Sequence, residues 1–96
     1  MTLRITHKQG STHRATLKLD GRVAAEWAAL LERECSGLLR SGTEVSLDLS
    51  AVTFVDRAGV QALERLSRKG VVIRCLPGAV ASVLEGEGVH VTLNAD

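Results

Sequence analysis

The sequence predicts a single α/β domain, residues 1–96, with a mixed central β-sheet and helices packed mainly on one face. Segments in which apolar residues alternate with polar ones are interleaved with segments whose apolar residues recur every three or four positions. Strands covered on both faces are continuously apolar, whereas four of these five strands alternate, so one face is expected to meet solvent. That face is predicted to carry Lys8, Thr16, Lys18, Ser46, Asp48, His90 and Thr92.

The N-terminal third is predicted to form a β-hairpin followed by a helix. Leu3 and Ile5 alternate with polar residues, turn-forming residues follow at 9–11, and alternation resumes over 15–19. Asp20 and Gly21 are strand breakers and are expected to end the second strand. From Val23 to a stop at Gly42 the spacing is that of an amphipathic helix. Its inward stripe is predicted to contain Val23, Trp27, Leu30, Leu31, Cys35, Leu38 and Leu39.

The remainder of the chain is predicted to alternate between strands and helices. Strands are expected over 44–55, 71–76 and 89–93, with a helix after Asp56 that ends at Gly70 and a short helix over 79–86. The element order is therefore β-β-α-β-α-β-α-β. Strands joined through helices are expected to pair in parallel by right-handed crossovers.

Composition argues against several functional classes. The formal net charge is +1 and the aromatic residues are Trp27 and Phe54, whereas nucleic-acid-binding proteins usually carry a basic stripe with stacking aromatics. No apolar run approaches the roughly 20 residues that cross a bilayer, and the first ten residues do not resemble a signal peptide. We therefore expect a cytoplasmic protein that neither binds nucleic acid nor inserts into a membrane.

The chemically versatile residues do not form a recognisable catalytic or metal-binding pattern. Cys35 and Cys75 lie in apolar patterns, so buried reduced thiols are expected. The three histidines lack the spacing of metal ligands, and no nucleophile is placed beside a base by sequence spacing. The sequence thus predicts no metal, no cofactor and no enzymatic activity, and favours a domain that works by binding.

The segment "VTFVDRAGV" marks the junction between a strand and a helix. Asp56 is predicted to cap the helix by accepting a hydrogen bond from the backbone N–H of Ala58 or Gly59. Gly59 would permit a close approach of the backbone or of a partner. The free N–H groups of a helix start also form a generic anion site, which by itself identifies no function.

Three stretches together resemble the STAS family, the sulfate-transporter and anti-sigma-factor-antagonist domain. They are "LKLDGRVAAEWAALLE", "VSLDLSAVTFVDRAGVQALERL" and "GVVIRCLPGAVASVLEGEGV", which cover most of the chain. The resemblance implies a STAS-type fold and the function of a stand-alone anti-sigma factor antagonist. Such a domain captures an anti-sigma factor that is often also a serine kinase. Phosphorylation of a serine at the start of the second helix releases the partner.

The sequence departs from this family at the switch itself. Its "DRAG" aligns with the family's "DSSG", so Arg57 replaces the first serine and Ala58 occupies the phosphoacceptor position without a hydroxyl. One alternative is an accessory STAS subunit that docks on the ATPase of an ABC transporter. A homodimer through the open sheet face and weak nucleotide binding at the helix start are also left open. The predicted partner-binding residues are Asp56, Arg57, Ala58, Gly59 and Val60.

Overall fold

The computed structural model describes residues 3–8 and 13–93, and within them the predicted order of strands and helices is confirmed. The predicted hairpin turn at 9–11 lies outside the described residues. The elements are β1 (Arg4–Lys8), β2 (Arg14–Val23), α1 (Ala25–Arg40), β3 (Glu44–Val55), α2 (Arg57–Arg68), β4 (Val72–Cys75), α3 (Ala79–Gly86) and β5 (Thr92–Leu93).

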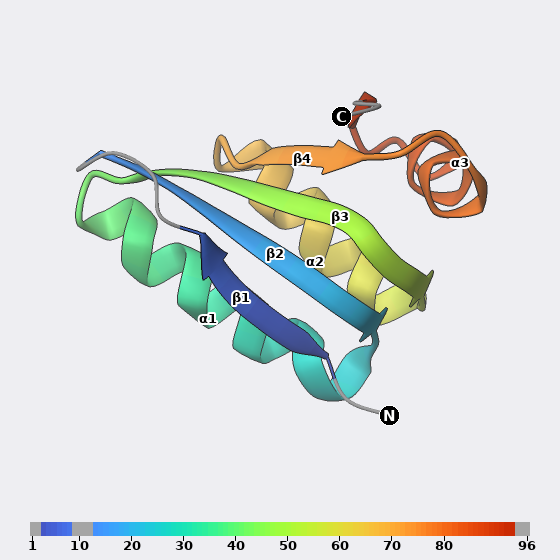
Figure 1. Ribbon diagram of the computed structural model, residues 1–96, viewed down its shortest axis with the longest axis horizontal. Helices are drawn as coiled ribbons and strands as arrows, with labels where there is room; N and C mark the ends of the chain where they lie inside the picture. Colours follow the sequence, from blue (N-terminus) through green and yellow to red (C-terminus); the bar gives the residue numbers. More distant parts are fainter. Residues whose placement is uncertain (1–2, 9–12, 94–96) are drawn as a thin grey trace.

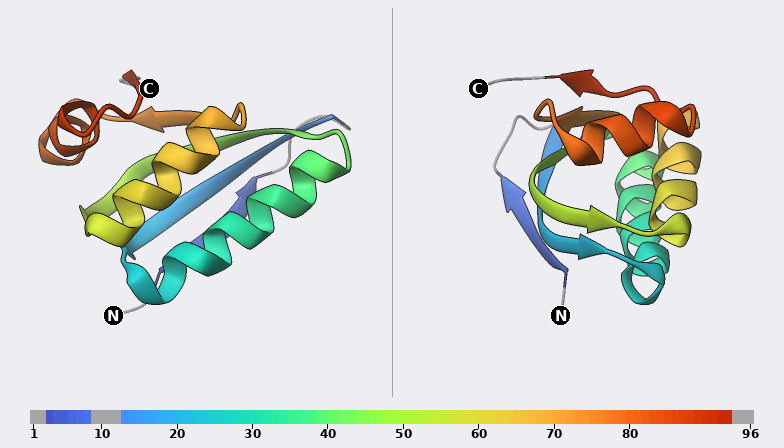
Figure 2. Two further views of the ribbon diagram at one scale, coloured as in Figure 1. Left: turned by 180° about the vertical axis from the view of Figure 1, so that it is seen from behind. Right: turned by 90° about the vertical axis from the view of Figure 1, so that its right-hand side faces the viewer.

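The five strands form one mixed sheet in the order β1-β2-β3-β4-β5. β1 is antiparallel to β2, and the other neighbours pair in parallel, as predicted for strands joined through helices. Helices α1 and α2 lie side by side on one face, whereas α3 lies beyond the end of β4 (Figures 1 and 2). The predicted mixed sheet with helices mainly on one face is confirmed.

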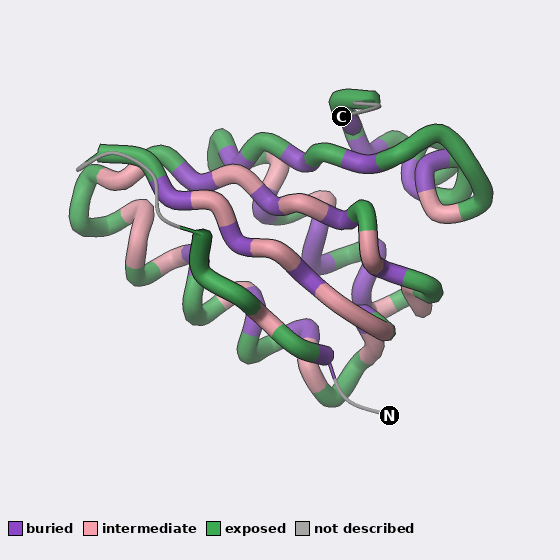
Figure 3. Tube along the Cα trace, in the orientation of Figure 1, coloured by how far each residue is buried: buried purple, intermediate pink, exposed green. Residues whose placement is uncertain are grey.

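The core lies between the sheet and the two long helices. Along β2, β3 and β4 buried and less buried residues alternate, as the tube in Figure 3 shows. Removal of these apolar side chains from water is the main favourable contribution to folding. The largest fully buried side chains are Leu19, Leu31, Leu47, Leu49, Leu63, Leu66, Ile73 and Leu84.

Both cysteines belong to this core. Cys35 is fully buried on α1, Cys75 is buried on β4, and both are free thiols, as predicted. Burial raises the pKa of the Cys35 thiol to about 12. Because the thiolate is the reactive form of cysteine, Cys35 is chemically inert at neutral pH.

The opposite face of the sheet is uncovered and polar. One row crosses all five strands through the paired positions of Thr6, Lys18, Asp48, Arg74 and Thr92. None of these five residues is buried. The prediction of a solvent-facing polar surface is therefore confirmed.

The predicted end of the second strand is wrong. β2 continues through Asp20 and Gly21 to Val23, because β3 is long enough to pair with it as far as Val55. The pairing shifts register between Lys18 and Asp20 and again after Gly21. Gly21 has a φ of +104°, which glycine adopts without the strain that a side chain would bring. The "breaker" residues therefore form an irregularity inside a strand.

The predicted limits of two further elements are also wrong. α1 begins at Ala25, so the fully buried Val23 belongs to β2. Leu30, expected on the inward stripe of α1, is 36% exposed, whereas Trp27 packs against the core while remaining only partly buried. β5 contains Thr92–Leu93 alone, since the buried residues ahead of it reach the core without pairing to β4. His90 therefore lies outside the sheet.

An ion pair joins the two long helices. Arg65 on α2 donates two hydrogen bonds, of 3.0 and 2.6 Å, to the carboxylate of Glu32 on α1. The hydrogen bond from Arg65 lowers the pKa of Glu32 below its ordinary value of 4.5. A carboxyl group with a lowered folded-state pKa stabilises the fold above its unfolded pKa, and this contribution is lost as the pH falls through the folded pKa.

We therefore expect Glu32→Gln to flatten the loss of stability with acidification below about pH 4.5. The free energy of unfolding, measured in urea at low salt across this range, checks the prediction. Arg65→Gln removes the other half of the pair and should flatten the profile in the same way. Identical pH profiles for Glu32→Gln and the unmodified protein would contradict the assignment.

Candidate functional site

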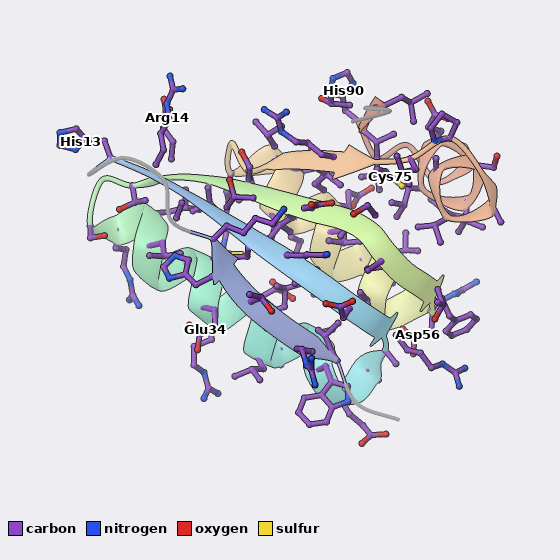
Figure 4. All side chains as sticks on the ribbon, in the orientation of Figure 1. His13, Arg14, Glu34, Asp56, Cys75 and His90 are labelled. Carbon is purple, nitrogen blue, oxygen red and sulfur yellow. The ribbon has the colours of Figure 1, made fainter. Side chains whose placement is uncertain are left out.

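The predicted site lies at the carboxyl ends of the parallel strands β2 and β3, where both α1 and α2 begin. Figure 4 shows Asp56 at this end of the sheet, while His13 and Arg14 lie at the opposite end. In open α/β sheets, ligands commonly bind outside the carboxyl ends of the strands. The predicted residues 56–60 are contiguous, and four of them form the first turn of α2.

The carboxylate of Asp56 is bonded to the start of both helices. Its Oδ1 accepts a hydrogen bond of 2.7 Å from the N–H of Gly59 and so caps α2, as predicted. Its Oδ2 accepts a second hydrogen bond, of 3.0 Å, from the N–H of Ala25 in α1. The N-cap residue of α1, Ala24, has no side-chain cap of its own. One carboxylate therefore satisfies donors at two helix starts, where negative charge is favourable.

Gly59 lies against the backbone at the end of β2. The N–H of Asp56 donates a 3.1 Å hydrogen bond to the carbonyl of Val23, which draws the start of α2 onto that strand. A Cβ atom on Gly59 would overlap the same carbonyl oxygen and lie 2.9 Å from Cγ1 of Val55. The close approach expected for Gly59 is therefore an approach of its own backbone. Asp56 and Gly59 fix the geometry of the junction.

Three of the predicted site residues differ in how much of their surface is accessible to a partner. Arg57 is exposed, Ala58 is half-buried and Val60 is only 8% exposed. Within the described residues, Arg57 makes no hydrogen bond or ion pair through its side chain. Arg57 is thus the predicted residue that is most available for contact.

A pocket of about 370 Å³ opens beside Arg57, between the start of α2, the end of β3 and α3. The contribution of α3 was not expected from the sequence, because it depends on where β4 delivers the chain after residue 75. The residues that line the pocket are Val55, Asp56, Arg57, Val60, Gln61, Val83 and Glu87.

An exposed cation–π pair, which the sequence did not predict, lies on the adjacent ends of β2 and β3. The guanidinium of Arg22 on β2 lies over the ring of Phe54 on β3, 4.6 Å from its centroid. Phe54 remains 42% exposed, and such a contact contributes about 0.5–1 kcal/mol at an exposed site. The only sequence signal was an aromatic residue next to the junction. Arg22 and Arg57 therefore place two guanidinium groups at this end of the domain, where Asp56 and Glu26 lie at the two helix starts.

At the junction, the described residues offer contact surface but no assembled catalytic group. Among the described residues, no group of three His, Cys, Asp or Glu side chains could hold a metal ion. His13 and His90 both lie far from Asp56 (Figure 4). Within the same residues, no helix is long and apolar enough to cross a membrane.

Comparison with known proteins places this architecture in a family. The family model described as "Mlab, STAS domain" matches residues 6–93. A search of curated proteins finds no match. An anti-sigma factor antagonist from Mycobacterium paratuberculosis has a similar structure, with a TM-score of 0.81 and 16% sequence identity over 99% of this chain and 87% of that one.

Two further solved structures share the fold. The phosphorylated form of the Bacillus cell fate determinant SpoIIAA has a TM-score of 0.68 and 14% identity over 90% of this chain and 85% of that one. The murine anion transporter Solute Carrier 26 family member A9 has a TM-score of 0.59 and 22% identity over 84% of this chain but only 15% of the transporter. The similarity therefore extends from small separate domains to a part of a large transporter. With the family match spanning residues 6–93, the chain belongs to the STAS domain family.

Proposed function

We propose that the chain is a non-catalytic interaction module that acts like an anti-sigma factor antagonist. Its partner is an anti-sigma factor that is also a serine kinase, bound through the junction between β3 and α2. Family membership and the similarity to solved anti-sigma factor antagonists support this proposal. The observation that carries the proposal is that neighbouring residues of the junction have different roles. The carboxylate of Asp56 accepts two backbone hydrogen bonds, while the side chain of Arg57 lies beside a pocket and is not paired with any other described residue.

The same junction would not be switched off by phosphorylation at its family position. A phosphoserine brings about −1.5 to −2 charges at neutral pH and three acceptor oxygens. The aligned residue here is Ala58, which has no hydroxyl to modify. Partner binding would therefore be constitutive and controlled by the amounts of the two proteins.

The alternative is an accessory subunit that docks on the ATPase of an ABC transporter. Ala58 favours this alternative, because a docking subunit needs a contact surface but no phosphorylation switch. Affinity capture from the native host, followed by mass spectrometry of the bound proteins, separates the two. A kinase-like anti-sigma factor supports the first proposal, and an ABC ATPase supports the second. The intact mass of the captured domain reports phosphorylation at any other position.

We expect Arg57→Glu to weaken binding of the captured partner at least about tenfold, equivalent to about 1.4 kcal/mol. The substitution places a carboxylate opposite the acidic group that we expect on the partner, so attraction becomes repulsion. Arg33→Glu is the matched control, because Arg33 is an exposed arginine in the middle of α1 and does not line the pocket. Isothermal titration calorimetry measures both affinities. Unchanged binding by Arg57→Glu would remove Arg57 from the interface.

A further inference from the structure

The pocket beside Arg57 joins the start of α2 to a helix that the proposed interface does not include. From it we infer that the docking surface extends onto α3. The pocket would take an aliphatic side chain of the protein partner, while Arg57 pairs with a neighbouring carboxylate of that partner. This inference rests on the proposed function and specifies the chemistry of its interface.

Three valines from three elements form the apolar part of the pocket lining. Val55 comes from β3, Val60 from α2 and Val83 from α3. Val83 is 48% exposed, although its neighbours Ala81 and Leu84 in the same short helix are buried in the core. Apolar side chains that converge on a hollow from three elements, with Val83 left half exposed, form a site for an apolar side chain.

A second exposed apolar group lies at the same end of β3, on the open face of the sheet. Phe54 directly precedes the lining residue Val55 and is held under the guanidinium of Arg22. Aromatic and arginine side chains are the types most often found among the residues that dominate binding energy. Because neighbouring strand residues point to opposite faces, the pair lies outside the pocket, and it adds exposed apolar surface and a second cation to this end of the sheet.

The rim of the pocket has charges of both signs. Arg57 contributes a cation and Glu87 an anion, and these two are not an ion pair in the described structure. Asp56 also lines the pocket, but its carboxylate is bonded to two backbone donors. A partner with a carboxylate beside its aliphatic side chain can satisfy Arg57 in only one orientation, because the reverse orientation would bring that carboxylate to Glu87.

A nucleotide phosphate is a poorer occupant of this pocket than a protein side chain. A phosphate at a helix start needs free backbone N–H groups. Here the N–H of Gly59 and the N–H of Ala25 already donate to Asp56, at 2.7 and 3.0 Å. A bound phosphate would also lie beside the carboxylates of Asp56 and Glu87, which repel it. Weak nucleotide binding at this helix start is therefore disfavoured.

The test compares two exposed valines in the full chain, against the partner captured with the unmodified domain and then purified. Val83→Glu places a charge in the pocket. Val72→Glu makes the same change on the uncovered face of β4, where the residue is 40% exposed. We expect Val83→Glu to weaken binding at least about tenfold and Val72→Glu to leave it within about twofold. Circular dichroism and urea unfolding establish that both variants fold.

The outcomes separate this inference from the proposed function. If Arg57→Glu weakens binding while Val83→Glu does not, the interface ends at α2 and the inference is overturned alone. If neither change weakens binding, or no captured protein binds the purified domain, the junction is not the docking surface and both proposals fail. A thermal shift with millimolar ATP that Val83→Glu abolishes would assign the pocket to a nucleotide and overturn the inference.

Discussion

Gly59→Ala is expected to destabilise the domain by about 3 kcal/mol or more, although alanine is the better helix former. Position 59 lies in the first turn of α2, where the added methyl group would overlap the carbonyl oxygen of Val23 and press on Val55. The obstacle is backbone, which cannot move aside as the end of a flexible side chain can. The helix start would have to leave the strand, and the hydrogen bond from the Asp56 N–H to the Val23 carbonyl would be lost.

A second helical glycine provides the matched control. Gly37 lies in α1, is exposed, and a Cβ atom there meets nothing within 4 Å. Gly37→Ala should therefore stabilise the domain by about 0.5–1 kcal/mol, the ordinary gain in a helix interior. Urea unfolding of both variants measures the difference. Equal effects at the two positions would show that α2 does not depend on close packing against β2.

The sheet was predictable because its determinants are local and repeated. Alternation along the strands identified the core face and the open face, and the helical segments between strands required parallel pairing. The end of β2 was not predictable from the same rules. Asp20 and Gly21 are strand breakers in isolation, but the length of β3 provides pairing partners on both sides of them. Tertiary pairing thus overrides the local preference.

At the site, too, local features could be predicted and long-range ones could not. The cap from Asp56 to Gly59 spans three residues and could be predicted, whereas the bond from Asp56 to Ala25 spans 31 and requires the fold. The pocket could not be predicted for the same reason. Its α3 residues are distant in sequence from α2, and only the fold brings them together. The functional prediction at Ala58, by contrast, depends only on the residue type at an aligned position.

The second large effect on stability is expected at Asp56, whose carboxylate is bonded to the starts of two helices. We expect Asp56→Ala to destabilise the domain by about 2–3 kcal/mol, because removal of one helix cap typically costs about 1 kcal/mol and this carboxylate also serves a second helix. The stability of Asp56→Asn should lie between that of Asp56→Ala and that of the unmodified protein. The single carbonyl oxygen of asparagine can accept from only one of the two N–H groups, while its amide group faces the other. Urea unfolding gives the order.

Hydrogen exchange tests whether one side chain stabilises both helices. In Asp56→Ala the amides of Gly59 and Ala25 should both lose protection, because each now donates to the carboxylate. Asp48→Ala is the control of the same residue type. Asp48 bonds the N–H of Ser50 and pairs with Lys8 on the open sheet face, so its loss should cost less than about 1 kcal/mol and leave both helix amides protected. Faster exchange at Gly59 alone would mean that α1 does not depend on Asp56. Loss of protection at both amides would make this carboxylate the common anchor of the starts of α1 and α2.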